Sequence, residues 1–153
     1  MNEFEAIEIL LAEDSEADAE MTIRALQRNN LANRLVWVKD GAEALDFIFR
    51  RGAYMQRPMA LPKLLLLDLK MPKVDGIEVL REVKSNDETK TMPVVMLTSS
   101  AEERDIVASY SLGVNSYIVK PVDFAKFADE VANAGCYWVL VNRAPGMAQN
   151  VSR

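Results

Sequence analysis

Residues 64–76 read Leu-Leu-Leu-Leu-Asp-Leu-Lys-Met-Pro-Lys-Val-Asp-Gly, and this stretch decides the fold. Four successive leucines without a polar residue are typical of a central strand in a parallel sheet, where helices cover both faces. The apolar run stops at Asp68, and Ile77, Leu80 and Val83 then follow at the spacing of one helix face. The stretch therefore predicts a buried strand, a polar connection and an amphipathic helix.

The same order of strand and helix recurs along the chain. We expect four more strands, at residues 7–12, 34–39, 93–98 and 116–119. Four more helices are expected, at about residues 16–29, 40–49, 100–113 and 123–135. Strands that alternate with helices form right-handed βαβ units around a parallel sheet. The predicted fold class is α/β, a doubly wound five-stranded parallel sheet with helices on both faces.

Two of these helices begin with the spacing of a capping box, Asp40 with Glu43 and Ser100 with Glu103. Gly113 is expected to end its helix in a left-handed conformation. These signals set the boundaries of the second and fourth helices.

Two segments lie outside this minimal pattern. Residues 52–62 form a connection longer than the usual length of about 4–6 residues. After Gly135, a β-like C-terminal arm is expected at Tyr137, Trp138, Val139, Leu140 and Val141. A strand-like apolar segment needs a partner, either the sheet edge or a second subunit. We therefore divide the chain into a domain at residues 1–135 and an arm with a tail at residues 136–153.

Composition excludes several kinds of chemistry. The 153 residues include no histidine and one cysteine, Cys136, so no Ser-His-Asp or Cys-His catalysis and no internal disulfide is possible. The net charge of −5 argues against nucleic acid and anionic membrane surfaces as partners. No apolar run reaches the roughly 18 residues of a membrane helix, and the acidic start lacks the basic flank of a signal peptide. We expect a cytoplasmic protein.

The polar residues that follow the predicted strands form the strongest functional signal. In an open parallel sheet, ligands bind outside the carboxyl ends of the strands. The residues at these ends are Glu13, Asp14, Asp68, Thr98 and Lys120. Three carboxylates, a hydroxyl and an ammonium are therefore expected at one rim.

This set of groups predicts a phosphoryl-binding site with a cation. Two carboxylates at about 4 Å repel by about 4 kcal/mol at an effective dielectric constant of 20, and a hard divalent cation such as Mg²⁺ relieves the repulsion. A lysine and a hydroxyl beside the cation suit phosphoryl oxygens. With no His or Cys among these residues the nucleophile must be an oxygen, and Asp68, after the most buried strand, is best placed to form an aspartyl-phosphate.

These residues resemble the receiver domain of two-component response regulators. The match rests on Glu13-Asp14, residues 68–76, Thr98-Ser99 and Lys120-Pro121, with Tyr117 three residues before the lysine. The motifs follow one another in the order of that family, over about residues 7–134. The resemblance implies a flavodoxin-like receiver fold.

The resemblance also implies a role for each residue. Asp68 would take a phosphoryl group from a sensor histidine kinase, with Thr98 and Lys120 on the phosphoryl oxygens. Mg²⁺ would be held by Asp14, Asp68 and the backbone carbonyl of Lys70, with Glu13 acting through water.

Two further expectations concern the switch and the backbone near Lys120. Tyr117 would be the switch residue, turning inward as Thr98 moves; a plain core aromatic is the alternative. The Lys120-Pro121 peptide bond is expected to be cis.

The long connection and the aromatic end at Tyr137-Trp138 resemble the stand-alone response regulators of bacterial and cyanobacterial phytochrome kinases. This narrower resemblance implies a kinase of the bacteriophytochrome type, output by contact with a downstream protein, and a homodimer formed through the arm. The protein would be a phosphoacceptor and not an enzyme for an external substrate.

Two other functions are consistent with parts of the pattern. The first is a pseudo-receiver, a binding module that never carries phosphate. The second is a haloacid-dehalogenase-like phosphatase, but such enzymes need an Asp two residues after the nucleophile, where this chain has Lys70.

Overall fold

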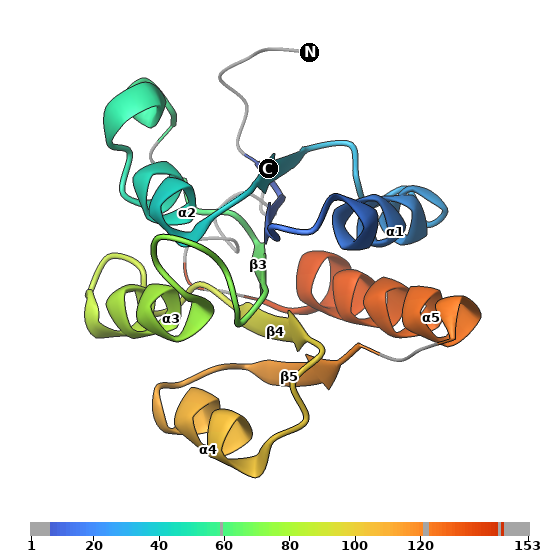
Figure 1. The fold of residues 1–153 in the computed structure, drawn as a ribbon. Helices are drawn as coiled ribbons and strands as arrows, with labels where there is room; N and C mark the ends of the chain where they lie inside the picture. Colours follow the sequence, from blue (N-terminus) through green and yellow to red (C-terminus); the bar gives the residue numbers. More distant parts are fainter. Residues whose placement is uncertain (1–6, 59, 121–122, 144, 146–153) are drawn as a thin grey trace.

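The computed structural model describes residues 7–58, 60–120, 123–143 and 145. Its elements follow in the order β1 (Ile9–Ala12), α1 (Glu16–Gln27), β2 (Leu35–Val38), α2 (Gly41–Ile48), η1 (Gly52–Tyr54), β3 (Leu64–Leu67), α3 (Gly76–Ser85), β4 (Val94–Thr98), α4 (Glu103–Ser111), β5 (Ser116–Val119), α5 (Phe124–Gly135) and η2 (Cys136–Val141). The strands form one parallel sheet in the order β2-β1-β3-β4-β5 (Figure 1). The predicted fold class is confirmed.

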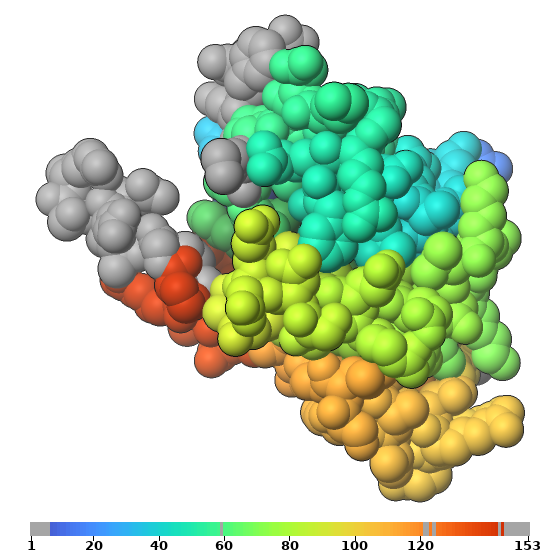
Figure 2. All heavy atoms as spheres, turned by 90° about the vertical axis from the view of Figure 1, so that its left-hand side faces the viewer, coloured from blue at the N-terminus to red at the C-terminus, as the bar shows by residue number. Residues whose placement is uncertain are grey.

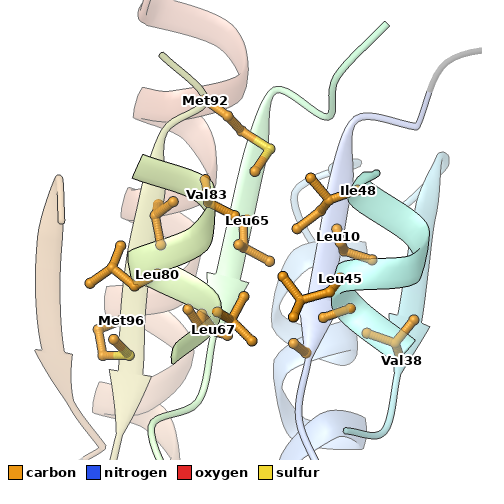
Figure 3. Packing of buried hydrophobic residues seen from close by; sticks show 14 of the residues in the cluster. Leu10, Val38, Leu45, Ile48, Leu65, Leu67, Leu80, Val83, Met92 and Met96 are labelled. Atoms are coloured by element: carbon orange, nitrogen blue, oxygen red, sulfur yellow. The ribbon is translucent and has the colours of Figure 1, made fainter. Parts of the chain in front are cut away.

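The four leucines of β3 lie in the middle of the sheet and are buried on both faces. Leu64 and Leu66 pack in a core with α1 and α5, whereas Leu65 and Leu67 pack in a second core with α2 and α3. Figure 3 shows the second core, with Leu65 and Leu67 between the side chains of α2 and α3. Successive side chains of a strand point to opposite faces, so an unbroken apolar run is what a double-sided core requires.

Helices cover the two faces unequally. The helices α1 and α5 contact each other on one face. The other face carries α2, α3 and α4, which Figure 2 shows from top to bottom in teal, yellow-green and orange. The strand order reverses between β1 and β3, and the parallel pairing of β1, β3 and β4 places their carboxyl ends beside one another.

Three predictions about caps have different outcomes. Asp40 accepts a hydrogen bond from the Glu43 amide, as predicted. Gly113 follows α4 with φ +100°, also as predicted. The capping box at Ser100 is wrong, because α4 begins at Glu103 and the Ser100 hydroxyl donates instead to the Asp105 carboxylate at 2.6 Å.

The long connection after α2 folds back onto that helix. The Arg57 guanidinium donates to the carbonyl oxygens of Phe47 and Ile48, which lie in the last turn of α2, and it stacks on the Phe47 ring. The Tyr54 hydroxyl donates to the Glu43 carboxylate at 2.7 Å. The connection therefore adds a charged donor to the carbonyl end of α2.

The prediction of a β-like C-terminal arm is wrong. Cys136–Val141 is a π-helical turn that continues α5, and the Asn142 amide donates to the Tyr137 carbonyl. Gly135 does not end the helix; a Cβ there would come within 2.8 Å of the Leu26 side chain, so the glycine lets α5 lie close to α1. A helix that already exists is extended without a new nucleus, and this advantage outweighs the β propensity of the segment.

Other expectations lie beyond what the structure tests. The Lys120-Pro121 bond falls outside the described residues, because Pro121 and Val122 are not among them. The division of the chain at residue 135 stays a prediction. Among the described residues, no helix combines the length and the hydropathy needed to cross a membrane.

Candidate functional site

The sheet brings the predicted site residues to one rim. Glu13 and Asp14 follow β1, Asp68 follows β3, Thr98 ends β4 and Lys120 follows β5. Carboxylate oxygens of Glu13, Asp14 and Asp68 all lie within 4.8 Å of one another. The Lys120 ammonium lies 2.6 Å from Glu13 and 4.0 Å from Asp68. Residues more than 100 positions apart in the chain therefore form one site.

Asp68 is held from both its backbone and its side chain. Its Oδ1 accepts a hydrogen bond from the Leu69 amide at 2.8 Å, and its own amide donates to the Ala12 carbonyl. A Cβ at Gly76 would lie 2.2 Å from the Asp68 carbonyl oxygen, so only glycine allows α3 to begin there. Asp68 is 8% exposed. Its Oδ2 faces the Lys120 ammonium at 4.0 Å.

Glu13 is the most buried carboxylate of the site, at 1% exposure. Its Oε1 accepts from Lys120 and its Oε2 accepts from the Ser15 amide. The Trp37 indole donates to the Glu13 carbonyl at 2.8 Å. Burial raises the pKa of Glu13 to about 7, with the Asp68 charge adding to the rise and the Lys120 hydrogen bond opposing it. Asp14, by contrast, is exposed.

Lys120 has a carboxylate partner that the sequence analysis did not include. Its ammonium donates to Asp18 at 2.7 Å, in addition to Glu13. Burial alone would lower the pKa of Lys120, but the hydrogen bonds to Asp18 and Glu13 and the charge of Asp68 raise it overall. The only signal of Asp18 in the sequence is its place three residues after Ser15, which by itself indicates a helix cap.

Thr98 and Tyr117 both contact Ser100. The buried Thr98 hydroxyl oxygen accepts from the Ser100 amide at 3.3 Å, and the Tyr117 hydroxyl donates to the Ser100 carbonyl at 2.8 Å. The Tyr117 ring is half-buried beside the α2 and α3 core, and this burial raises its pKa. Lys70 is exposed in the connection after Asp68.

The site as a whole is strongly acidic, because four carboxylates surround one ammonium. Its possible metal ligands are all oxygen atoms, without imidazole or thiolate. Hard divalent cations prefer such ligands, so the residues present fit a cation of the Mg²⁺ or Mn²⁺ kind.

Comparison with known proteins identifies the fold family. Residues 9–132 match the model of the response regulator receiver domain. The chain belongs to the response regulator receiver family. Receivers bind divalent metal ions, which agrees with the acidic cluster at the rim.

Two known regulatory proteins are similar to this chain over most of their length. The probable methanogenesis regulatory protein FilR2 of Methanothrix harundinacea is 40% identical over 92% of this chain and 88% of its own. The response regulator Rcp1 of Synechocystis is 40% identical over 86% of this chain and 88% of its own.

Solved receiver structures agree with the fold. The Mn²⁺-bound form of Rcp1 has a TM-score of 0.83 at 38% identity, covering 90% of this chain and 98% of its own. The phosphorylated cyanobacterial phytochrome response regulator RcpA has a TM-score of 0.85 at 37% identity, covering 93% and 100%. The bacteriophytochrome response regulator AtBRR has a TM-score of 0.72 at 50% identity, covering 91% and 99%.

Proposed function

We propose that this receiver accepts a phosphoryl group from a sensor histidine kinase on Asp68, in a Mg²⁺-dependent reaction, and signals by protein contact. The observation that carries the proposal is the geometry at Asp68. Oδ1 is held by the Leu69 amide, whereas Oδ2 faces the Lys120 ammonium across 4.0 Å. One oxygen is fixed and the other is free to act as a nucleophile.

In the proposed step, Asp68 Oδ2 attacks the phosphorus of a phosphohistidine. An O–P bond forms as the N–P bond breaks, and the imidazole nitrogen keeps the electron pair of the broken bond. The Lys120 ammonium and the Thr98 hydroxyl would contact phosphoryl oxygens. Because these 153 residues contain no histidine, the phosphohistidine must lie outside them. Later hydrolysis at Asp68 would be the only turnover.

The proposed Mg²⁺ ligands are Asp14, Asp68 and the Lys70 carbonyl, with Glu13 acting through water. Few-carboxylate sites suit Mg²⁺, which keeps several waters. When bound, the ion would supply positive charge that offsets the charge of the phosphoryl oxygens. The relative Rcp1 has a Mn²⁺-bound form, which supports the binding of a divalent cation by this chain.

Tyr117 is proposed as the switch. Thr98 and Tyr117 both hydrogen-bond to Ser100, one through its amide and the other through its carbonyl. A movement of Thr98 toward a phosphoryl group would therefore act on the residue that holds Tyr117. An added phosphoryl group brings charge and acceptor oxygens, which bias such a two-state element.

A phytochrome-type pathway is supported by the relatives RcpA and AtBRR, which are phytochrome response regulators. We place the reaction in the cytoplasm.

For the downstream protein, Val107 and Tyr110 on α4 offer exposed apolar side chains. FilR2 is a probable methanogenesis regulator, so the input should be tested with several kinases.

We also propose a homodimer formed through Tyr137–Val141. Leu140 and Val141 at the end of this segment are 68% and 62% exposed, whereas Val139 is buried in the core. The structure therefore favours a double substitution, Leu140→Glu with Val141→Glu, over truncation. Light scattering should give a dimer mass for the wild type and a monomer mass for the variant; a monomeric wild type would contradict this part.

The deciding experiment is phosphotransfer from a panel of the host's histidine kinases, with Mg²⁺ present or chelated. We expect one kinase to label the wild type, no label on Asp68→Asn, and no label without the cation. No transfer from any kinase, together with normal signalling by Asp68→Asn, would instead indicate a pseudo-receiver. Against the phosphatase alternative, residues 9–132 match the receiver family and Lys70 stands where the phosphatase family needs Asp.

A further inference from the structure

Asp18 is the third residue of α1, where an acidic side chain can complete a capping box, but its carboxylate does not accept from the Ser15 amide. Ser15 begins α1, and its hydroxyl oxygen accepts from the Asp18 amide at 3.2 Å. In a full capping box, the third helical residue would accept from the amide of the capping serine. Here the Ser15 amide donates to Glu13 instead. The Asp18 carboxylate is therefore released to reach Lys120.

Lys120 is anchored by two carboxylates and is separated from a third. Its ammonium lies 2.6 Å from Glu13 and 2.7 Å from Asp18, which are charge-assisted hydrogen bonds. The distance of 4.0 Å to Asp68 Oδ2 is longer than the roughly 2.7–2.9 Å of such a bond. An ammonium has three donors, so one remains on the Asp68 side for an oxygen placed between them.

The two anchors differ in their relation to a cation. Glu13 belongs to the cluster of carboxylates whose oxygens lie close enough to hold a metal ion, and Asp18 does not. A ligand role for Glu13 would compete with its hydrogen bond to Lys120. Asp18, 31% exposed on its side chain, is the anchor that cation binding leaves in place.

We propose that Asp18 is a positioning residue that fixes the Lys120 ammonium beside the phosphoryl group on Asp68 when a cation occupies the acidic cluster. This inference rests on the proposed function, because it needs a phosphoryl group at Asp68. Asp18 does not touch the phosphoryl group, and its effect passes through Lys120.

Beryllofluoride, which mimics a phosphoryl group without covalent transfer, is the direct probe. Its affinity for the full chain should be measured by calorimetry at saturating Mg²⁺, and the Mg²⁺ affinity separately. Asp18→Ala should weaken beryllofluoride binding about tenfold, the low end for a hydrogen bond to a charged group, because Asp18 is partly exposed. Mg²⁺ affinity should change less than about threefold, because Asp18 lies outside the acidic cluster. Asp18→Asn, which keeps an acceptor oxygen, should give an intermediate loss.

Two controls separate positioning from charge and from stability. Glu16→Ala removes a carboxylate from the same first turn of α1, where Glu16 is exposed, and should leave beryllofluoride affinity within about twofold of wild type. In a Lys120→Ala background, adding Asp18→Ala should have no further effect, because the partner is gone. A purely structural role would persist in that background.

The outcomes distinguish this inference from the proposed function. If the wild type binds beryllofluoride and Asp18→Ala binds it equally or more tightly, the inference alone is wrong. The same holds if the loss persists without Lys120. A wild type that binds no beryllofluoride and takes no phosphoryl group overturns the proposed function, and this inference with it.

Discussion

Two lysines, one at the carboxyl-end edge of the sheet and one at the amino-end edge, have opposite kinds of partner. Lys120, after the carboxyl end of β5, faces the carboxylates Glu13, Asp18 and Asp68. Lys84, at the end of α3, donates to the carbonyls of Lys90 and Met92 and to the Asn115 side chain, at 2.7–3.1 Å. The pKa of Lys120 is raised, whereas burial lowers the pKa of Lys84 to about 8.

The difference separates the proposed functional edge from a structural one. At the Lys84 edge, neutral acceptors satisfy the ammonium, and Asn115 also accepts from the Val94 amide, so the starts of β4 and β5 are joined. At the Lys120 edge, one cation faces an excess of negative charge that needs a further cation. Stability and function are therefore built from the same residue type in different surroundings.

The largest effect is expected from removing the Lys120 ammonium. Lys120→Met should lower the rate of Asp68 phosphorylation by acetyl phosphate by about 10²–10³-fold, the usual cost of removing a donor that faces developing charge. Incorporation can be followed by intact-protein mass spectrometry. Lys84→Met is the matched control and should keep the wild-type rate. Similar losses in both variants would remove the distinction between the edges.

The reverse effect is expected for stability. Lys84→Met should lower the free energy of unfolding by about 1–2 kcal/mol, because three acceptors lose a donor although water reaches the site in part. Urea unfolding followed by circular dichroism measures this value. The control Lys90→Met removes only an exposed ion pair with Asp87 and should cost less than about 0.5 kcal/mol. Equal costs would show that Lys84 is no more than a surface lysine.

The pH dependence of stability should show the lowered pKa of Lys84. Its folded value of about 8 lies below the ordinary 10.5, so the unfolded chain binds more protons between these pH values. The wild type should therefore gain stability relative to Lys84→Met as the pH rises from 8 toward 10. Urea midpoints of both proteins at pH 7.5, 9 and 10 test this. Parallel curves would argue against it.

The smallest effect is expected from a substitution that gives Lys84 a charged partner, as Lys120 has. Asn115→Asp keeps the acceptor oxygen Oδ1 and places a carboxylate at about 3 Å from the ammonium. The pKa of Lys84 should rise above its present value of about 8, measured by NMR titration of the lysine side chain. Stability should change by less than about 1 kcal/mol, since the pair is partly exposed. An unchanged pKa would mean that the new carboxylate does not act on the Lys84 ammonium.

Much of this architecture could be predicted because local patterns and the final packing agree. The leucines of β3 indicate a central strand, and parallel strands bring Asp68 and Lys120 to one rim wherever the helices lie. Asp18 could not be predicted, because its spacing from Ser15 already has a sufficient explanation as a cap. Its carboxylate is available to Lys120 because the Ser15 amide donates to Glu13, and the sequence does not reveal this contact.

The C-terminal segment was predicted wrongly because its local pattern disagrees with the final packing. Its apolar residues after Gly135 have the composition of a strand, and glycine usually marks a helix end. The outcome depended on the close approach of α5 to Leu26 and Leu31, which favours glycine inside the helix. A single sequence does not reveal that approach, so composition alone was misleading.

The hydrogen bond from the Trp37 indole to the Glu13 carbonyl has an optical consequence. It couples a fluorophore on β2 to the backbone of the acidic rim, so the emission of Trp37 should respond when that rim changes charge. The second tryptophan, Trp138, lies against Tyr137 in the extension of α5. The protein thus carries one intrinsic fluorophore bonded to the acidic rim and a second in the extension of α5.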